Sequence, residues 1–287
     1  MGIVDFILNL AGLLLWLNWR SIRFDPLVKR RPATLMGTLR PAAPQKFRRW
    51  HLLVFIAVLL FLRAVIYHWI GTAANWTGQL DFGPVVLSCR SDWFLRILAF
   101  SFFSFGLTLG MFYICLLPLS LLAGPEPFHS LVKIPLGRID DWPRWAKFIL
   151  PFLATALFWW LASWTFGWLG ITLKQISPAE RFEQSILIGL GSYLLWKFPL
   201  GAILLLHLLN SYVYFGKHPF WKYINAVAQS LLSPLQKIPL QAGKVDFAPL
   251  VGITVIFLAA HVIEHGISLG ASFYIPGLQD IYARLPF

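Results

Sequence analysis

Charged residues are scarce in this chain. Asp, Glu, Lys and Arg make up 13% of its 287 residues, whereas hydrophobic residues make up 58%. A soluble domain carries roughly twice that share of charge. Acidic residues are the scarcest group, with 12 Asp and Glu against 24 Lys and Arg. This composition excludes an ordinary soluble domain and predicts an integral membrane protein.

Cysteine is also scarce. Two residues, Cys89 and Cys115, exclude a disulfide framework and a zinc knuckle. The first apolar run, residues 3–19, lacks the basic start and the small-residue cleavage site of a signal peptide, so we expect it to be retained. The basic residues cluster in loops between apolar runs, which indicates membrane topology and anionic headgroups rather than nucleic acid.

Six apolar stretches approach the length of about 20 residues that a helix needs to cross a bilayer. They cover residues 3–19, 51–71, 94–122, 147–170, 185–213 and 247–269. The third and fifth are long and contain Pro118 and Pro199, which favours a kink or a tilt. The predicted fold class is therefore an all-α polytopic membrane protein with about six transmembrane helices.

Lysine and arginine are distributed unequally between the two sides of such a protein. The three odd-numbered loops carry 17 of them, and the opposite side carries five. Because cytoplasmic loops retain positive charge, both termini are predicted to lie outside the cytoplasm.

The basic loops contain an internal repeat. The tetrapeptide Lys-Ile-Pro-Leu occurs at 133–136 and again at 237–240, and an aspartate follows a basic residue shortly after each copy. We interpret the chain as three parallel hairpins around an axis near the membrane normal. The predicted divisions are a degenerate first hairpin at 1–72, a second at 93–171, a third at 184–270 and a short external tail at 271–287.

The third basic loop contains a predicted amphipathic helix. Between Pro219 and Ser233, apolar residues recur at steps of three and four, which is typical of a helix lying in the membrane interface. The chain would then break at Pro234 and return into the bilayer near Asp246. A carboxylate at Asp246 could cap the sixth span, or it could belong to a charged collar that binds lipid headgroups or a partner protein.

The residues from 233 to 260 resemble the signature of the YggT (YlmG) family of small bacterial and plastid membrane proteins. The resemblance covers about 210–263 well and the second hairpin weakly, and it includes the basic, proline-punctuated segment before the sixth span. The candidate interaction residues are Pro234, Lys237, Pro239, Gly243, Asp246 and Pro249, with Lys133, Pro135, Arg138 and Asp140 in the second copy.

The resemblance implies a non-enzymatic role without a cofactor, as an assembly or membrane-organising factor in a bacterial inner membrane. The basic loops predict anionic lipid headgroups as a partner, together with a membrane protein or a second copy of the chain. A conduit for a small solute or ion, linked to osmotic tolerance, is the alternative. A metal-binding or haem-binding membrane protein is the second alternative.

Histidines raise the metal alternative. His261, Glu264 and His265 have the spacing of inverted zinc peptidases, but only Asp280 follows as a carboxylate ligand, so the ligand set is incomplete. His68 and His207 lie in or near spans and have the right ligand type for haem.

Two cations fall inside predicted spans. A charge there costs at least about 2.5 kcal/mol unless it is paired or solvated. Neither Arg63 nor Lys197 has an obvious acidic partner within the membrane, because the candidates, Asp5 and Glu264, lie near the outer surface.

Overall fold

The computed structural model places most of the chain. It describes residues 2–24, 49–74, 76–82, 86–122, 129–171, 177–213, 218–235, 241–242, 245–269 and 273–284. The chain forms two compact units, Met1–Gly78 with Cys89–Thr108, and Gln79–Ser88 with Leu109–Phe287. Helix α4 contributes to both units, so their boundary differs from those of the predicted hairpins.

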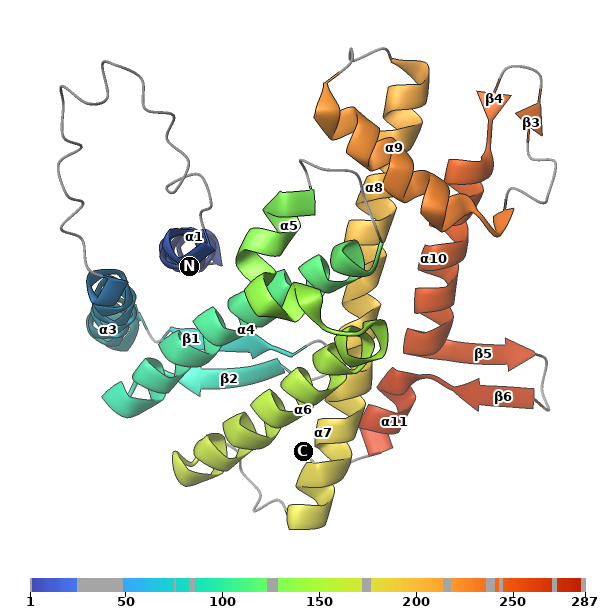
Figure 1. Ribbon diagram of the computed structural model, residues 1–287. Helices are drawn as coiled ribbons and strands as arrows, with labels where there is room; N and C mark the ends of the chain where they lie inside the picture. Colours follow the sequence, from blue (N-terminus) through green and yellow to red (C-terminus); the bar gives the residue numbers. More distant parts are fainter. Residues whose placement is uncertain are drawn as a thin grey trace, which may run out of the picture. The chain divides into compact units, whose positions relative to one another are not determined.

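Within the described residues, six helices are long and apolar enough to cross a membrane. They are α1 (Gly2–Phe24), α3 (Arg49–Ala74), α4 (Phe94–Leu121), α6 (Arg144–Trp168), the run α7–η3–α8 (Pro178–Gly191, Ser192–Trp196, Lys197–Tyr212) and α10 (Ala248–His265), as Figure 1 shows. The prediction of a largely helical, multi-pass membrane protein is confirmed at this level. The repeat arrangement and the orientation in the membrane stay predictions.

In the first unit α1 packs against α3. Leu52, Ile56, Leu60 and Ala64 follow one another at four-residue steps and are buried, so one face of α3 forms the core of this unit. Apolar side chains on its other faces are exposed, as lipid-facing residues would be. Strands β1 (Thr77–Asp81) and β2 (Val86–Arg90) pair between α3 and α4.

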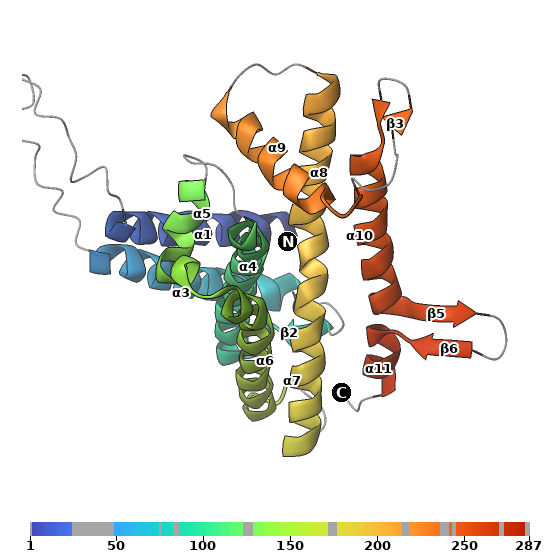
Figure 2. The same ribbon diagram turned by 45° about the vertical axis from the view of Figure 1, so that its right-hand side comes forward.

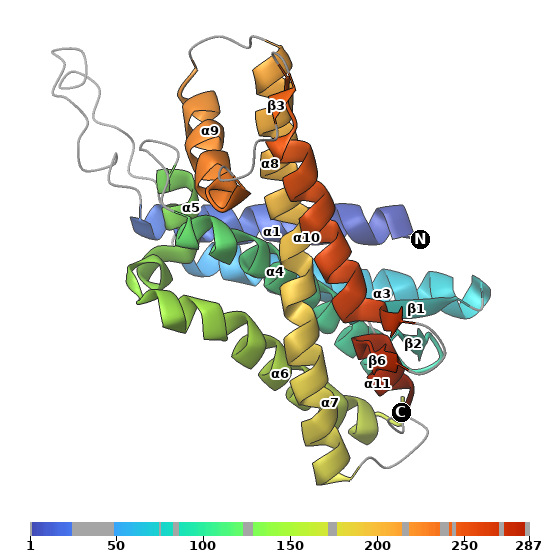
Figure 3. The same ribbon diagram turned by 90° about the vertical axis from the view of Figure 1, so that its right-hand side faces the viewer.

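In the second unit α6 packs along α7, and α10 packs along α8 (Figures 1 and 3). The short helix α9 (Pro219–Leu232) lies across α8 (Figure 2). Gly252 allows α10 to approach closely, because a Cβ there would lie 2.9 Å from Leu232 and 3.1 Å from Leu204.

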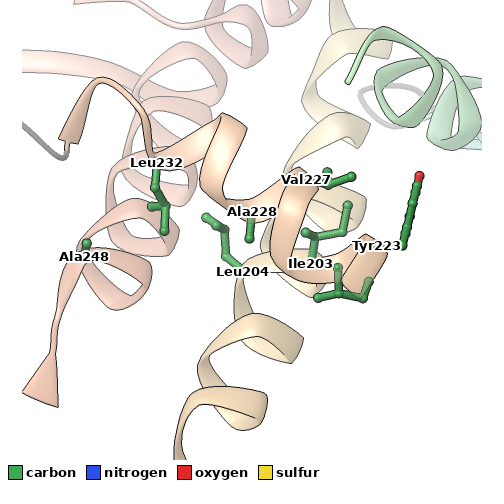
Figure 4. Close-up of a cluster of buried hydrophobic side chains, with 8 residues drawn as sticks. Ile203, Leu204, Tyr223, Val227, Ala228, Leu232 and Ala248 are labelled. Carbon is green, nitrogen blue, oxygen red and sulfur yellow. The ribbon is translucent and has the colours of Figure 1, made fainter. Parts of the chain in front are cut away.

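One face of α9 is buried in an apolar cluster. The cluster contains Ile203, Leu204, Tyr223, Ile224, Val227, Ala228, Leu232 and Ala248 (Figure 4). Lys222, Gln229 and Ser230 are exposed on α9. Burial of large aliphatic side chains contributes roughly 1.5–3 kcal/mol each, so this cluster fixes α9 against α8 and the start of α10.

The fifth span is longer than a bilayer requires. Its 35 residues extend from Pro178 to Tyr212, about 52 Å at the helical rise, against about 30 Å of hydrocarbon. It begins earlier than predicted because Ser177 and Glu180 form a capping box, in which each side chain accepts a hydrogen bond from the other's backbone N–H. A 3₁₀ turn, η3, interrupts it at Ser192–Trp196.

The end of the chain is more structured than the short tail that was predicted. Strands β5 (Gly266–Leu269) and β6 (Phe273–Pro276) pair antiparallel, and α11 (Leu278–Arg284) follows. Consequently α10 ends at His265, before the predicted end of the sixth span. In α11, Asp280 accepts hydrogen bonds from the Tyr274 hydroxyl and the Gly277 N–H, which lower its pKa.

Cysteine labelling tests the predicted orientation. A membrane-impermeant maleimide should label Val86→Cys on β2 in intact cells, but Gln229→Cys on α9 only after permeabilisation, because positive charge predicts that the α9 side is cytoplasmic.

The native chain is the control. Its Cys115 lies within α4. Cys89 is fully buried, and burial raises the pKa of its thiol to about 11, so it stays protonated and unreactive at pH 7. The opposite labelling would place both termini in the cytoplasm.

Candidate functional site

A buried ion pair lies in the second basic loop, between α4 and α6. The loop contains α5 (His129–Leu136) and the 3₁₀ helix η2 (Gly137–Asp141). Gly137 has φ 59°, a conformation that disfavours other residues. This backbone reversal after α5 places Asp140 next to the first turn of α6.

Asp140 connects three elements of this unit. Its carboxylate accepts a hydrogen bond of 2.5 Å from the Ser120 hydroxyl on α4 and lies 3.5 Å from the Lys147 ammonium on α6. Lys147 also donates to Ser120 at 2.8 Å. The side chains of Lys147 and Asp140 are 8% and 6% exposed. Breaking a buried pair leaves an uncompensated charge, so these contacts hold the loop to both spans.

The same carboxylate faces α9. Burial raises the pKa of Tyr223, and the negative charge of Asp140 raises it further. The hydroxyl of Tyr223 points away from the apolar cluster in Figure 4. The negative charge of Asp140 therefore acts on Tyr223 of α9 as well as on Lys147 of α6.

Ser120 and Lys147 contain the atoms of a serine–lysine catalytic pair, in which the lysine accepts the proton of the serine. Here the Ser120 hydroxyl donates to Asp140 and accepts from Lys147. Both side chains also contact the Asp140 carboxylate, which pairs with the lysine. We therefore interpret the cluster as a structural ion pair.

The other predicted residues of the second loop have separate contacts. Lys133 forms an exposed ion pair of 3.4 Å with Asp141. Pro135 is buried, and its carbonyl accepts a hydrogen bond from Tyr113. Arg138 is exposed. The loop thus buries one charged pair and presents its remaining cations on its surface.

In the third loop, Asp246 accepts a 2.9 Å hydrogen bond from the Ala248 N–H at the start of α10. The N-cap residue of α10 is Phe247, which has no side-chain cap, so Asp246 contacts the first helical N–H from one position before the N-cap predicted for it. Pro249 is buried in the first turn of α10, and Pro234 is exposed just after α9. Lys237, Pro239 and Gly243 lie outside the described residues. Asp140 and Asp246, which correspond in the predicted repeat, therefore have different contacts.

Arg63 is paired inside the first unit. It is 1% exposed and donates to Asp5 at 2.6 Å, to Asn9 at 2.7 Å and to Ser104 at 3.1 Å. Its guanidinium also lies 5.4 Å from the centre of the Tyr67 ring, and the Tyr67 hydroxyl donates to Asp5. Asp5, a candidate partner from the sequence, is the carboxylate that the arginine contacts.

Lys197 is paired in the second unit. Its ammonium lies 3.2 Å from Glu264, the other candidate partner from the sequence. Gln279 of α11 also donates to Glu264. Glu264 is therefore committed to a cation and an amide, and not to the histidines beside it in the sequence.

The histidines have ordinary contacts. The rings of His261 and His265 lie 4.4 Å apart on exposed turns of α10. Nδ1 of His207 contacts Asn225, and Nδ1 of His68 contacts the Ser91 carbonyl. In the described part of the chain, no three His, Cys, Asp or Glu side chains form a group that could hold a metal ion.

No family model matches the chain, and neither a curated protein nor a solved structure matches it. The resemblance to YggT proteins therefore stays a prediction based on the residues of the third hairpin. Sequence reasoning did not single out Ser120 and Lys147. The sequence signal that could have indicated this contact is a lysine at the very start of an apolar span, shortly after an aspartate in the preceding loop.

The two ion pairs of the second loop should differ in their effect on stability. We expect Lys147→Ala to lower the free energy of unfolding by about 3–5 kcal/mol, because Asp140 stays buried without its cation. Lys133→Ala is the matched control and should cost less than about 1 kcal/mol, since its pair is exposed. Denaturant titration in mild detergent measures both. Equal losses would contradict the assignment of a buried pair.

Arg63 should not tolerate lysine. Arg63→Lys keeps the charge but cannot reach Asp5, Asn9 and Ser104 together, so we expect a loss of about 1–3 kcal/mol of unfolding free energy. Arg96→Lys, in an i,i+4 pair of 3.4 Å with Asp92, is the control and should lose less than about 1 kcal/mol. The same titration applies, and an unchanged Arg63→Lys protein would mean that the network is solvated.

Proposed function

We propose that this protein is a non-enzymatic assembly or membrane-organising factor of the YggT type in a bacterial inner membrane. It would act through its basic loops on the cytoplasmic side, with both termini outside. The observation that supports this most is the second loop, which is folded onto its spans by the buried Asp140–Lys147 pair and exposes its other cations. A loop held in one shape is a suitable binding surface because little ordering is needed on association.

The contacts of the reactive side chains favour binding over catalysis. Ser120 and Lys147 are committed to an ion pair, and Glu264 is committed to Lys197. We propose the exposed side of α9, with Lys222, Gln229 and Ser230, as the surface for a membrane-protein partner or a second copy of the chain. The apolar cluster under α9 keeps this side turned outward.

A conduit has less support. Arg63 and Lys197, the cations that the sequence placed inside spans, lie 2.6 Å and 3.2 Å from a carboxylate. Such pairs lower the free-energy cost of placing a charge in the membrane, but they leave few polar groups available to contact a permeating ion. We therefore interpret both pairs as fixing helices to one another.

A pull-down from mild detergent, analysed by mass spectrometry, tests the proposal. The intact protein should retain reproducible partners, and Lys222→Glu with Gln229→Glu should remove them while the protein stays folded. Asp246→Asn removes a further loop charge but can still accept the hydrogen bond from the Ala248 N–H, whereas Asp246→Ala would confound binding with the loss of that contact.

The control is Arg284→Glu, which changes an exposed charge on α11 and should leave the partners bound. A protein that is monomeric, captures nothing and conducts ions in liposomes would overturn the proposal in favour of a conduit.

A further inference from the structure

We infer that the exposed corner formed by Arg138, Trp142, Arg144 and Trp145 binds the headgroups of anionic phospholipids. This corner, called here the headgroup corner, lies where η2 ends and α6 begins. All four side chains are exposed. The inference rests on the proposed function only for the side of the membrane on which the corner lies.

The charge of this corner is positive after internal pairing. Asp140 is buried with Lys147, and Asp141 is paired with Lys133. Neither Arg138 nor Arg144 forms an ion pair with any residue that the structure describes. Two guanidinium groups are thus left facing outward, and their planar donors match phosphate oxygens.

Tryptophans on α6 set the depth of the corner in the bilayer. Trp145 is 69% exposed and Trp164 is 62% exposed. The two residues are 19 positions apart, which corresponds to about 28 Å along a helix, close to the thickness of the hydrocarbon core. Tryptophan favours both membrane interfaces, so these two residues place Arg144 at headgroup level.

The surface between these tryptophans suits acyl chains. Trp145, Ile149, Leu153 and Leu157 follow one another at four-residue steps along α6 and are exposed. A lipid bound at the corner could therefore place its phosphate against the arginines and its chains along this apolar side. An acidic soluble protein would complement the charge but would meet exposed apolar residues directly below it. The continuity of the two surfaces favours lipid.

The buried pair explains why the corner keeps its form. Asp140 and Lys147 lie on either side of Trp142 and Arg144 in the sequence, and their contact closes the turn from η2 into α6. Arg144 is therefore presented from a fixed backbone, and Arg138 lies two residues before the pair, in η2. A charge on a fixed backbone needs less ordering to bind a headgroup than a flexible charge would.

Native mass spectrometry of the intact purified protein, titrated with phosphatidylglycerol or phosphatidylcholine of equal chain length, tests this inference. The native protein should prefer phosphatidylglycerol. Arg138→Gln with Arg144→Gln should weaken phosphatidylglycerol binding roughly fivefold for each arginine removed and leave phosphatidylcholine binding unchanged. Arg138→Lys with Arg144→Lys keeps the charge and should retain most of the preference.

The matched control is Arg90→Gln with Arg284→Gln, which removes the same charge from β2 and α11 and should leave the preference intact. Should the glutamine pair lower the melting temperature, the two single variants replace it, each with an expected fivefold loss. A preference that survives in the glutamine variants, an equal loss in the control, or binding of an acidic peptide without any lipid preference would overturn the inference.

These results separate the inference from the proposed function. The lipid titration uses purified protein alone, whereas the pull-down reports protein partners through α9. Captured partners without lipid preference would leave the function standing and remove the headgroup corner. Lipid preference without captured partners would support the headgroup corner and remove the proposed function.

Discussion

The ion pair between Asp140 and Lys147 organises the second basic loop. A carboxylate and an ammonium that are both more than nine-tenths buried would be costly to separate, because each would lose its counter-charge away from water. Ser120 satisfies a further hydrogen bond of each partner. The direction in which the loop leaves α4 and returns to α6 follows from this three-way contact. The exposed cations of the loop take their positions from it.

Paired charge also joins helices within each unit. Arg63 connects α3 to α1 through Asp5 and Asn9 and to α4 through Ser104. Lys197 connects α8 to α10 through Glu264. In lipid, where apolar contacts between helices gain little from the hydrophobic effect, hydrogen bonds of this kind carry more of the specificity of packing. The chain has few acidic residues, and three of the twelve are used in these pairs.

Hydropathy predicted the spans because crossing about 30 Å of hydrocarbon requires long apolar runs. The sequence also offered Asp5 and Glu264, near the outer surface, as candidate partners of Arg63 and Lys197. The Asp140 cluster could not be predicted in the same way. Ser120, Asp140 and Lys147 meet only because the backbone reverses at Gly137. The strands and α11 depend on similarly local hydrogen bonds that leave no periodic signal.

The fifth span has a mechanical consequence. Its first part, α7, packs against α6, whereas its second part, α8, packs against α10 and α9. A single backbone therefore belongs to two different helix pairs. The 3₁₀ turn at Ser192–Trp196 has poorer hydrogen-bond geometry than the α-helix on either side, so bending would concentrate there. A force that tilts α10 would reach α6 through this joint, and the stiffness of five residues would set how much of the tilt is transmitted.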